Sequence, residues 1–340
     1  MKLNRRVLLG AAAATAAGVM AGLPSRPALA SDPKRLNVKL NWIKNVQYGP
    51  LWIATKKGYF TEEGLEIAVS AGGPNTPQPV VSVSAGADDI GYSAWIPFLD
   101  AVIQGNDMVA FSATFPRAPL GILSMPARPI LEPKDILGTR ILAQGASQRS
   151  SIEATLALNG LPNDWEMVPA GYSPEPLLAG EAHGFTGFST NEAVVLEQMG
   201  MVRGKDFHFV SFDDLGYRSY GAVLFAKREF LKSRRADVVG FTRAVIRGTI
   251  DNDKDPAYAA KLSVEEFGVD YGLDIDQQTR QAEAQIPLTV AGDGRKLLAL
   301  DLDEIAGPMY AAARATGRDK LPEPESIIDL SIVEEAHASI

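Results

Sequence analysis

The alternation of hydrophobic and polar positions starts at residue 36 and predicts the first elements of the fold. Residues 36–40 alternate strictly, as in a strand with one buried face. A helix is expected next, because Pro50 suits a first turn and Gly58 a C-terminal stop. The same order then repeats, which predicts a parallel sheet covered by helices. Strands are expected at 36–40, 65–69, 89–93 and 108–115, and helices at 50–57, near 79–86 and at 95–104.

A second alternating series follows the proline-rich stretch 115–133 and predicts a second sheet. The chain then returns through the strand-like run 220–227, and the remainder is mainly helical. We therefore expect an inserted domain, with residues 31–120 and 222–340 in one lobe and 121–221 in the other. Expected strands are 140–143, 165–168 and 183–188, and expected helices are 151–159, 175–179, 192–199, 236–249, 256–267, 274–285 and 300–315.

Residues 1–30 have the three parts of an export signal. A basic start is followed by a hydrophobic stretch over 7–20 and by an A-x-A site at 28–30. The stretch is too short to span a bilayer, which needs about 20 residues. Arg5-Arg6 resembles a twin-arginine signal, and the alternative is a chance pair in an ordinary secretory signal. A soluble protein outside the cytoplasm, without a lipid-anchored cysteine, is expected.

Charge and composition exclude several functions. Removal of residues 1–30 takes away four basic residues, leaving 33 − 4 = 29 Lys and Arg against 41 Asp and Glu, a net charge of −12. Such a surface argues against nucleic acid, which is bound through many basic contacts. The absence of cysteine excludes disulfides and thiolate metal sites. Because the three histidines are far apart in sequence, a metal site or a histidine-based triad is not expected.

Aromatic and amide side chains gather at predicted strand ends in the first lobe. Trp42, Asn45 and Tyr48 follow the first strand, and Tyr92 and Trp95 lie at the end of the third. A flat heterocycle binds well between such aromatic faces, and an amide can read a ring nitrogen beside an amino group. The alternatives are that the tryptophans pack under the sheet and that the asparagine satisfies its own turn.

Three glycine-containing turns precede predicted helices, at 72–76, 145–148 and 187–191. Each would present free backbone N–H groups to one cleft, although any α/β sheet needs turns of this kind. The second turn also brings Ser147 and Arg149. This arginine could pair with a sulfonate or carboxylate, or simply bridge to a neighbour on the surface.

Several short motifs stand out along the chain: Trp42, Asn45 and Pro50-Leu51, the elements KGYF (57–60) and EGL (63–65), and the segments 84–88, 134–138 and 213–217. Together they resemble periplasmic substrate-binding proteins of ABC importers, in the branch related to thiamin-pyrimidine binders and fungal pyrimidine synthases. The KGYF element is shared with sulfonate, taurine and nitrate binders, so it indicates fold and role rather than ligand. The resemblance implies a type II-like α/β protein of two lobes, each a mostly parallel sheet flanked by helices, with the ligand in the cleft between them.

The resemblance also implies site residues. A second-lobe glutamate meets the aminopyrimidine in the resembled binders, and Asn191-Glu192 fall where that residue is expected; a first-turn Glu that stabilises its helix is the alternative. Tyr217 ends a matching segment. The resembled synthases carry a cysteine cluster and a loop histidine, whereas this chain has no cysteine and has Tyr48 at the histidine position.

The expected function is therefore capture of a small planar N-heterocycle, first of all a thiamin-precursor pyrimidine, for an ABC permease. We expect a periplasmic monomer that acts without cofactor or metal and is not an enzyme. The first alternative is a binder of an organic anion such as a sulfonate, taurine or an aromatic carboxylate. The second alternative is a pyrimidine-synthase-like enzyme.

Overall fold

The computed structural model describes residues 33–340, apart from residues 74 and 291–293. The predicted export signal lies outside the described residues. Residues 33–340 form one compact unit. Among the described residues, the helices are too short or too polar to cross a bilayer.

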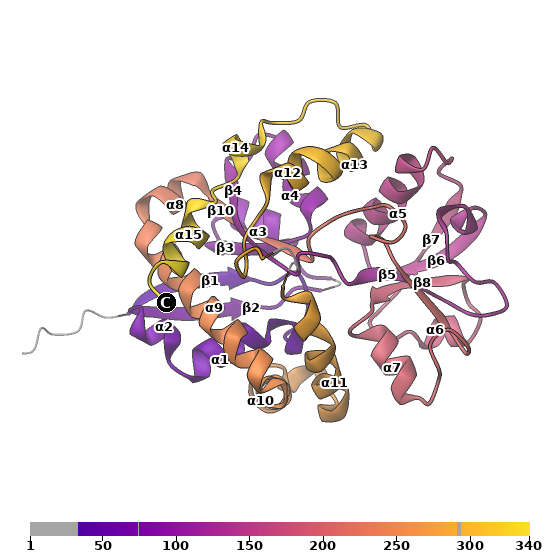
Figure 1. Ribbon diagram of the computed structural model, residues 1–340, viewed down its shortest axis with the longest axis horizontal. Helices are drawn as coiled ribbons and strands as arrows, with labels where there is room; N and C mark the ends of the chain where they lie inside the picture. The colour runs from indigo at the N-terminus through magenta and orange to yellow at the C-terminus, as the bar shows by residue number, and fades with distance from the viewer. Residues whose placement is uncertain (1–32, 74, 291–293) are drawn as a thin grey trace, which may run out of the picture. The chain divides into compact units, whose positions relative to one another are not determined.

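Two five-stranded sheets form the framework of this unit (Figure 1). The first contains β1 (Lys34–Lys39), β2 (Leu65–Ser70), β3 (Ile90–Ser93), β4 (Met108–Thr114) and β10 (Ala222–Lys227), in the order β2-β1-β3-β10-β4. The second contains β5 (Leu120–Ser124), β6 (Thr139–Ala143), β7 (Trp165–Pro169), β8 (Gly184–Phe188) and β9 (His208–Ser211), in the order β7-β6-β8-β5-β9. The elements of the first sheet with their helices are called the first lobe below, and those of the second sheet the second lobe.

Both sheets are mostly parallel, with one antiparallel strand at the same place in each order. In the first sheet β10 runs antiparallel to β3 and β4, and in the second β5 runs antiparallel to β8 and β9. Each of these strands follows a segment that crosses between the sheets, so it enters its sheet at the end where the parallel strands finish. Strand–helix alternation predicted most of the parallel strands but missed β5 and the parallel strand β9. β5 follows β4 with no helix between them, whereas β9 does follow a helix, Glu192–Gln198.

Helices cover the sheets and form most of the C-terminal part of the chain (Figure 1). Those before β5 are α1 (Gly49–Lys56), α2 (Tyr59–Glu62), α3 (Pro79–Ala85) and α4 (Trp95–Ile103), with a 3-10 turn, η1 (Val46–Tyr48). The second lobe has α5 (Ala146–Leu158), α6 (Glu175–Leu178) and α7 (Glu192–Gln198). After β10 come α8 (Arg228–Ser233), α9 (Arg235–Lys254), α10 (Pro256–Leu262), α11 (Ile275–Gln285), α12 (Leu302–Glu304), α13 (Tyr310–Ala315), α14 (Pro324–Ile327) and α15 (Ser331–His337).

Four predicted helices have clearly different bounds in the structure. α9 runs to Lys254, five residues beyond the predicted end at 249, and the helix expected over 256–267 is divided into α10 and a π turn over Ser263–Phe267. α5 begins at Ala146, five residues before the predicted start, because Gly145 serves as its N-cap and the hydroxyl of Ser151 bonds back to the carbonyl of Ser147. The helix expected over 300–315 is divided into α12, a π turn over Ile305–Met309 that contains Pro308, and α13. Proline cannot donate a helical hydrogen bond, which accounts for the irregular turn.

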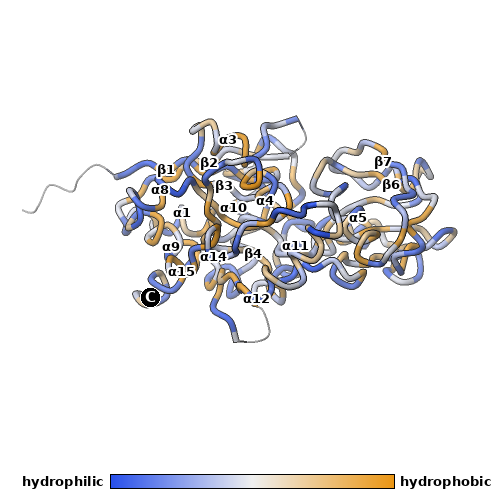
Figure 2. Tube along the Cα trace, turned by 90° about the horizontal axis from the view of Figure 1, so that it is seen from above, coloured by the Kyte–Doolittle hydropathy of each residue, from blue (hydrophilic) through white to orange (hydrophobic). Residues whose placement is uncertain are grey.

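The hydrophobic core is continuous between the lobes on one side. In Figure 2 the hydrophobic colour lies mainly within the packed elements and much of the hydrophilic colour on the outer loops. One cluster of buried residues joins Phe98 and Phe225 of the first lobe to Ile141 and Ile152 of the second. Helices α5 and α13 pack against each other at this place. The lobes therefore share an apolar contact beside the segments that connect them.

The two crossing segments, 115–119 and 212–221, are hydrogen-bonded to each other. The backbone N–H of Gly221 donates to the carbonyl of Phe115 at 3.0 Å, and that of Ala118 donates to the carbonyl of Ser219 at 3.0 Å. A Cβ at Gly221 would lie 2.7 Å from the ring of Phe115, so only glycine fits this close approach. The crossing segments thus form one paired connection between the lobes.

Candidate functional site

A cavity of about 190 Å³ lies between the lobes at the carboxyl ends of the parallel strands. Ligands of open α/β sheets bind at this edge. The lining residues come from both sheets and from both crossing segments. They are Asn41, Trp42, Gln47, Gly73, Asn75, Gln78, Pro79, Ser93, Ala94, Ile96, Pro97, Ala118, Leu120, Gln144, Gly145, Ala146, Ser147, Gln148, Ser151, Thr186, Gly187, Phe188, Asn191, Glu192, Phe212, Tyr217, Ser219, Tyr220 and Gly221.

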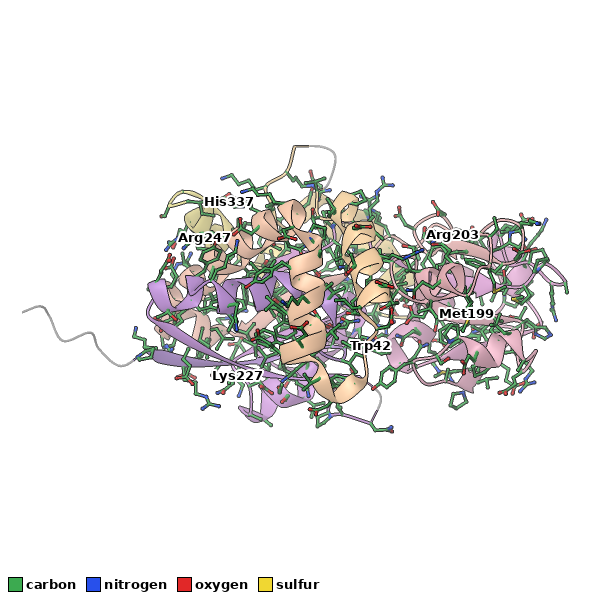
Figure 3. The ribbon with its side chains drawn as sticks, turned by 90° about the horizontal axis from the view of Figure 1, so that it is seen from below. Trp42, Met199, Arg203, Lys227, Arg247 and His337 are labelled. Atoms are coloured by element: carbon green, nitrogen blue, oxygen red, sulfur yellow. The ribbon has the colours of Figure 1, made fainter. Side chains whose placement is uncertain are left out.

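The loop after β1 supplies one wall. Trp42 is half-buried where the lobes meet (Figure 3), and its ring stands edge-on to Tyr172 of the second lobe, with ring centroids 5.2 Å apart. Asn41 lines the cavity beside it, and its Oδ1 accepts a 2.6 Å hydrogen bond from the hydroxyl of Tyr48. Burial raises the pKa of Tyr48 well above its ordinary value, so this hydroxyl stays a donor. The loop therefore offers an aromatic face and an amide whose orientation is fixed.

The three glycine turns all line the cavity, as their position after strands predicted. The second turn is the first turn of α5, where the N–H groups of Ala146, Ser147 and Gln148 have no acceptor within the helix. Gln144, just before it, donates through its side chain to the carbonyl of Thr186 at 2.9 Å and accepts from the Thr186 hydroxyl at 2.8 Å. The second lobe therefore presents backbone donors and a fixed amide to the cavity.

Glu192 is buried at the start of α7, with 5% of its surface exposed. Its Oε2 accepts from the backbone N–H of Phe188 at 2.7 Å, and its Oε1 accepts from the side-chain amide of Asn191 at 2.9 Å. Burial raises the pKa of the Glu192 carboxyl to about 7, and these hydrogen bonds oppose the rise. Because a carboxylate has about four acceptor positions, it can still accept a hydrogen bond from a ligand.

Gly187 makes room for this carboxyl. A Cβ at Gly187 would lie 2.9 Å from both Cβ and Oε2 of Glu192, closer than any real contact of this kind. Glycine at this position therefore permits the side chain of Glu192 to fold back over the end of β8.

The cavity wall has an acidic side chain but no basic one among the described lining residues. Among the described residues that line it, Glu192 is the single charged side chain, and lysine, arginine and histidine do not occur. The remaining polar groups are amides, hydroxyls and backbone N–H groups. Such a wall suits a neutral or cationic ligand that donates hydrogen bonds.

Five of the predicted contacts line the cavity: Trp42, Ser147, Asn191, Glu192 and Tyr217. They come from four different parts of the chain, which the sequence could only place near strand ends.

The other five predicted contacts do not line this cavity. Asn45 is 2% exposed, and its side chain caps η1 by accepting from the N–H of Gln47. Tyr48 and Tyr92 lie behind the wall, edge to face with centroids 5.7 Å apart. Trp95 is 1% exposed and packs against Phe98 in the core.

Arg149 lies in the first turn of α5 and does not line the cavity. Its guanidinium lies 3.6 Å from the carboxylate of Glu153, one helical turn later, and 5.7 Å from the ring centre of Trp165. The structure therefore shows the alternative stated for Arg149, a surface ion pair with a neighbouring side chain.

Sequence reasoning missed several polar side chains of the wall. They are Asn41, Gln47, Gln78, Gln144, Gln148, Ser151 and Thr186. Asn41 comes two residues after the end of β1 and Gln144 directly follows β6, so their placement after a strand was a usable signal. The others have no local pattern that separates them from surface residues.

Comparison with known proteins agrees with the fold. The periplasmic aliphatic sulphonate-binding protein SsuA of Escherichia coli superposes with a TM-score of 0.66 at 14% identity, over 87% of this chain and 92% of that chain. The architecture is therefore that of a periplasmic binding protein. A model of the NMT1/THI5-like family matches residues 45–259, more than half of the chain. The chain belongs to this family.

Relatives in sequence carry the name of an enzyme. The 4-amino-5-hydroxymethyl-2-methylpyrimidine phosphate synthase of Schizosaccharomyces pombe is 27% identical over 231 residues, 65% of this chain and 66% of the relative. A protein of the same name from Legionella pneumophila is 24% identical over 241 residues, 69% of this chain and 74% of the relative. The match thus spans about two thirds of the length of the relatives, and the fold is shared with binding proteins.

Proposed function

We propose that this chain is the substrate-binding component of an ABC importer and that its ligand is a small planar N-heterocycle. The first candidate is an aminopyrimidine of the thiamin-precursor type. The observation that carries the proposal is the cavity wall, in which one buried carboxylate, Glu192, stands without a cationic side chain among the described lining residues.

Two features of the wall favour a flat ring with an amino group. Trp42 offers an aromatic face, and stacking adds about 0.5–1.5 kcal/mol per pair beyond the burial of area. Glu192 accepts N–H groups, while amides such as Asn41 can meet ring nitrogens. The pyrimidine in the names of the relatives agrees with this ligand class.

We propose that the protein binds its ligand without catalysing a reaction of it. The chain contains no cysteine, and Tyr48, at the position of the loop histidine in the resembled synthases, is buried and donates to Asn41. The synthase names of the relatives are the argument against this part of the proposal. Incubation of the protein with 4-amino-5-hydroxymethyl-2-methylpyrimidine, followed by mass spectrometry, should return the compound unchanged; a new product would overturn it.

Closure of the lobes is the proposed mechanism. The lobes comprise residues 31–120 with 222–340, and residues 121–221, and they rotate about the paired crossing segments. The shared cluster around α5 and α13 supports rotation about that side, so that the cavity opens between Trp42 and Tyr172. Ligand drives closure because its contacts with both lobes exist together only in the closed state.

The place of action follows from the same role. We propose that the mature protein is a periplasmic monomer that delivers its ligand to a permease in the inner membrane. The periplasmic binding proteins of the same fold support this location, and the N-terminal signal pattern supports export.

A second candidate is an organic anion such as a sulfonate. The N–H groups at the start of α5 favour it, because a helix N-terminus stabilises negative charge. The carboxylate of Glu192 on the same wall counts against it.

A thermal-shift panel separates the two candidates. The compounds are 4-amino-5-hydroxymethyl-2-methylpyrimidine, the analogue without the 4-amino group, and an alkanesulfonate. A ligand at a hundredfold excess over Kd stabilises the folded protein by about 2.7 kcal/mol. We expect stabilisation by the amino compound; stabilisation by the sulfonate alone would overturn the heterocycle assignment in favour of the anion.

A further inference from the structure

Helix α11 of the first lobe buries an unusual set of amide side chains beside α7 of the second lobe (Figure 1). Four glutamines are at most 7% exposed: Gln277, Gln278, Gln281 and Gln285. A buried amide is costly unless its donors and acceptors find partners. Packing alone would be served better by leucine at these positions, so the hydrogen bonds of the amides are what this helix face provides.

The direction of these hydrogen bonds is fixed at one end by the backbone. The N–H of Val46, which can only donate, reaches Oε1 of Gln278 at 2.8 Å. The amide nitrogen of Gln278 must therefore point the other way, and it donates to Oε1 of Gln277. This in turn sets the amide nitrogen of Gln277 as a donor. An amide orientation that is ambiguous in isolation is thus determined by a chain of partners.

The chain continues across the cleft to the candidate ligand contact. Gln277 Nε2 donates to Oδ1 of Asn191 at 2.7 Å, and Asn191 Nδ2 then donates to Oε1 of Glu192 at 2.9 Å. At the far end the N–H of Phe188, also a pure donor, holds Oε2 of Glu192. Both carboxylate oxygens are therefore held as acceptors while Gln277 and Asn191 are in contact.

Separation of the lobes would break this chain at one bond only, between Gln277 and Asn191. The amide of Asn191 would then be free to turn, and the hydrogen bond on Oε1 of Glu192 would no longer be enforced from the first lobe. The start of the chain, Val46, lies in the same loop as the cavity residues Trp42 and Gln47. The chain therefore connects the two walls of the cavity that a ligand would touch.

We propose that Gln277 is a specificity-determining positioning residue, which through Asn191 holds the Glu192 carboxyl as a hydrogen-bond acceptor when the lobes close. The closed state then favours ligands that donate N–H groups. This inference rests on the proposed function, since it concerns how the same site recognises its ligand.

The test compares two ligands rather than measuring affinity alone. Calorimetric Kd values are determined for 4-amino-5-hydroxymethyl-2-methylpyrimidine and for its analogue without the 4-amino group. A hydrogen bond from the 4-amino group to the Glu192 carboxylate should make the Kd of the amino compound about tenfold or more lower than that of the analogue in the unaltered protein. We expect Gln277→Ala to reduce this preference to about threefold or less, because Glu192 loses its fixed acceptor geometry.

Two further variants exclude a purely structural effect. Gln277→Glu keeps the size of the side chain but cannot donate to Asn191 when ionised, so it should lose the preference as well. Gln198→Ala removes another contact at the α7–α11 interface, the 3.4 Å hydrogen bond from Gln198 to Asp274. Asp274 accepts from the backbone N–H of Gln277 but takes no part in the side-chain hydrogen bonds that lead to Glu192. This control should keep the preference of the unaltered protein. An unchanged preference in Gln277→Ala or Gln277→Glu, or an equal loss in the control, would overturn the inference.

Failure of the proposed function gives a different result. If the unaltered protein binds neither pyrimidine, the heterocycle assignment is wrong. The chain of hydrogen bonds from Gln277 to Glu192 is then tested without ligand. Unfolding temperatures of Asn191→Ala, Gln277→Ala and the double variant form a double-mutant cycle. Residues that share one chain of hydrogen bonds should give clearly non-additive shifts in unfolding temperature. Additive shifts would contradict the hydrogen-bonded connection between Gln277 and Asn191.

Discussion

Glu192 gives the most informative prediction, because its protonation should be visible in the stability of the protein. Burial raises the pKa of its carboxyl from 4.5 to about 7. In the folded protein this group therefore holds a proton at pH values where the unfolded chain has already released it. Its stabilising contribution is present in full below about pH 4.5 and is lost as pH rises through about 7.

The size of the effect follows from the same two values. One pKa unit corresponds to about 1.36 kcal/mol, so a difference of about 2.5 units amounts to about 3 kcal/mol of unfolding free energy. Glu192→Gln removes the titration and so should remove this slope. Other groups, such as Asp251, whose pKa is lowered mainly by the Lys57 ammonium, titrate in both proteins and cancel in the difference.

Urea unfolding followed by tryptophan fluorescence, from pH 4.5 to 8, measures the difference between the two proteins. We expect the unaltered protein to lose about 3 kcal/mol relative to Glu192→Gln across this range, with most of the change complete by about pH 7. A difference that stays constant with pH, or one that increases in favour of the unaltered protein, would refute the assignment of Glu192 as a buried carboxyl with a raised pKa.

Three other substitutions test the site. Trp42→Ala should weaken heterocycle binding about 2- to 13-fold through lost stacking, with loss of ring burial added, while full affinity in calorimetry would make Trp42 a packing residue. Gly187→Ala places a methyl group 2.9 Å from Glu192 and should lower the free energy of unfolding in urea by about 1–3 kcal/mol. The control Gly171→Ala, with open space at its Cβ, should lower it far less, and equal losses would contradict the close packing at Gly187. Arg149→Ala should leave heterocycle affinity within about twofold, because its guanidinium bridges to Glu153 on the surface; a large loss would return Arg149 to the site.

The sequence predicted the elements whose hydrophobic pattern is regular. The strand at 36–40 and the helix at 95–104 appear as β1 and α4 within one or two residues, because burial on one face and clear stop signals act locally. β5 was missed because its five residues lie inside a proline-rich stretch, and it is stabilised by pairing with β8 and β9, which are distant in sequence. Such pairing leaves no local periodic signal.

Local sequence signals likewise indicated only some of the site residues. Trp42 and Glu192 could be proposed because they follow a strand and a glycine turn, and both line the cavity. Trp95 follows a strand equally well, yet it is the first residue of α4 and its ring packs into the core. Position after a strand therefore indicates the correct edge of the sheet, while the direction of the side chain depends on the helix phase that follows.

Gln277 illustrates what no local pattern could indicate. In sequence it belongs to a polar run at the start of a helix, which is typical of an exposed face. Its hydrogen bond to Asn191 joins residues 86 positions apart and exists only because α11 of the first lobe lies beside α7 of the second. The role proposed for it could therefore be found only in the folded protein.

The central claim is that Glu192 and the wall around it select an amino-bearing heterocycle, and isothermal titration calorimetry at pH 8 tests it most directly. At this pH the Glu192 carboxyl, with its pKa of about 7, is mostly ionised. The account predicts one-to-one binding of 4-amino-5-hydroxymethyl-2-methylpyrimidine to the unaltered protein, a loss of about tenfold or more in Glu192→Gln, and no heat with an alkanesulfonate. Binding of the sulfonate without binding of the pyrimidine, or pyrimidine affinity that is unchanged in Glu192→Gln, would contradict it.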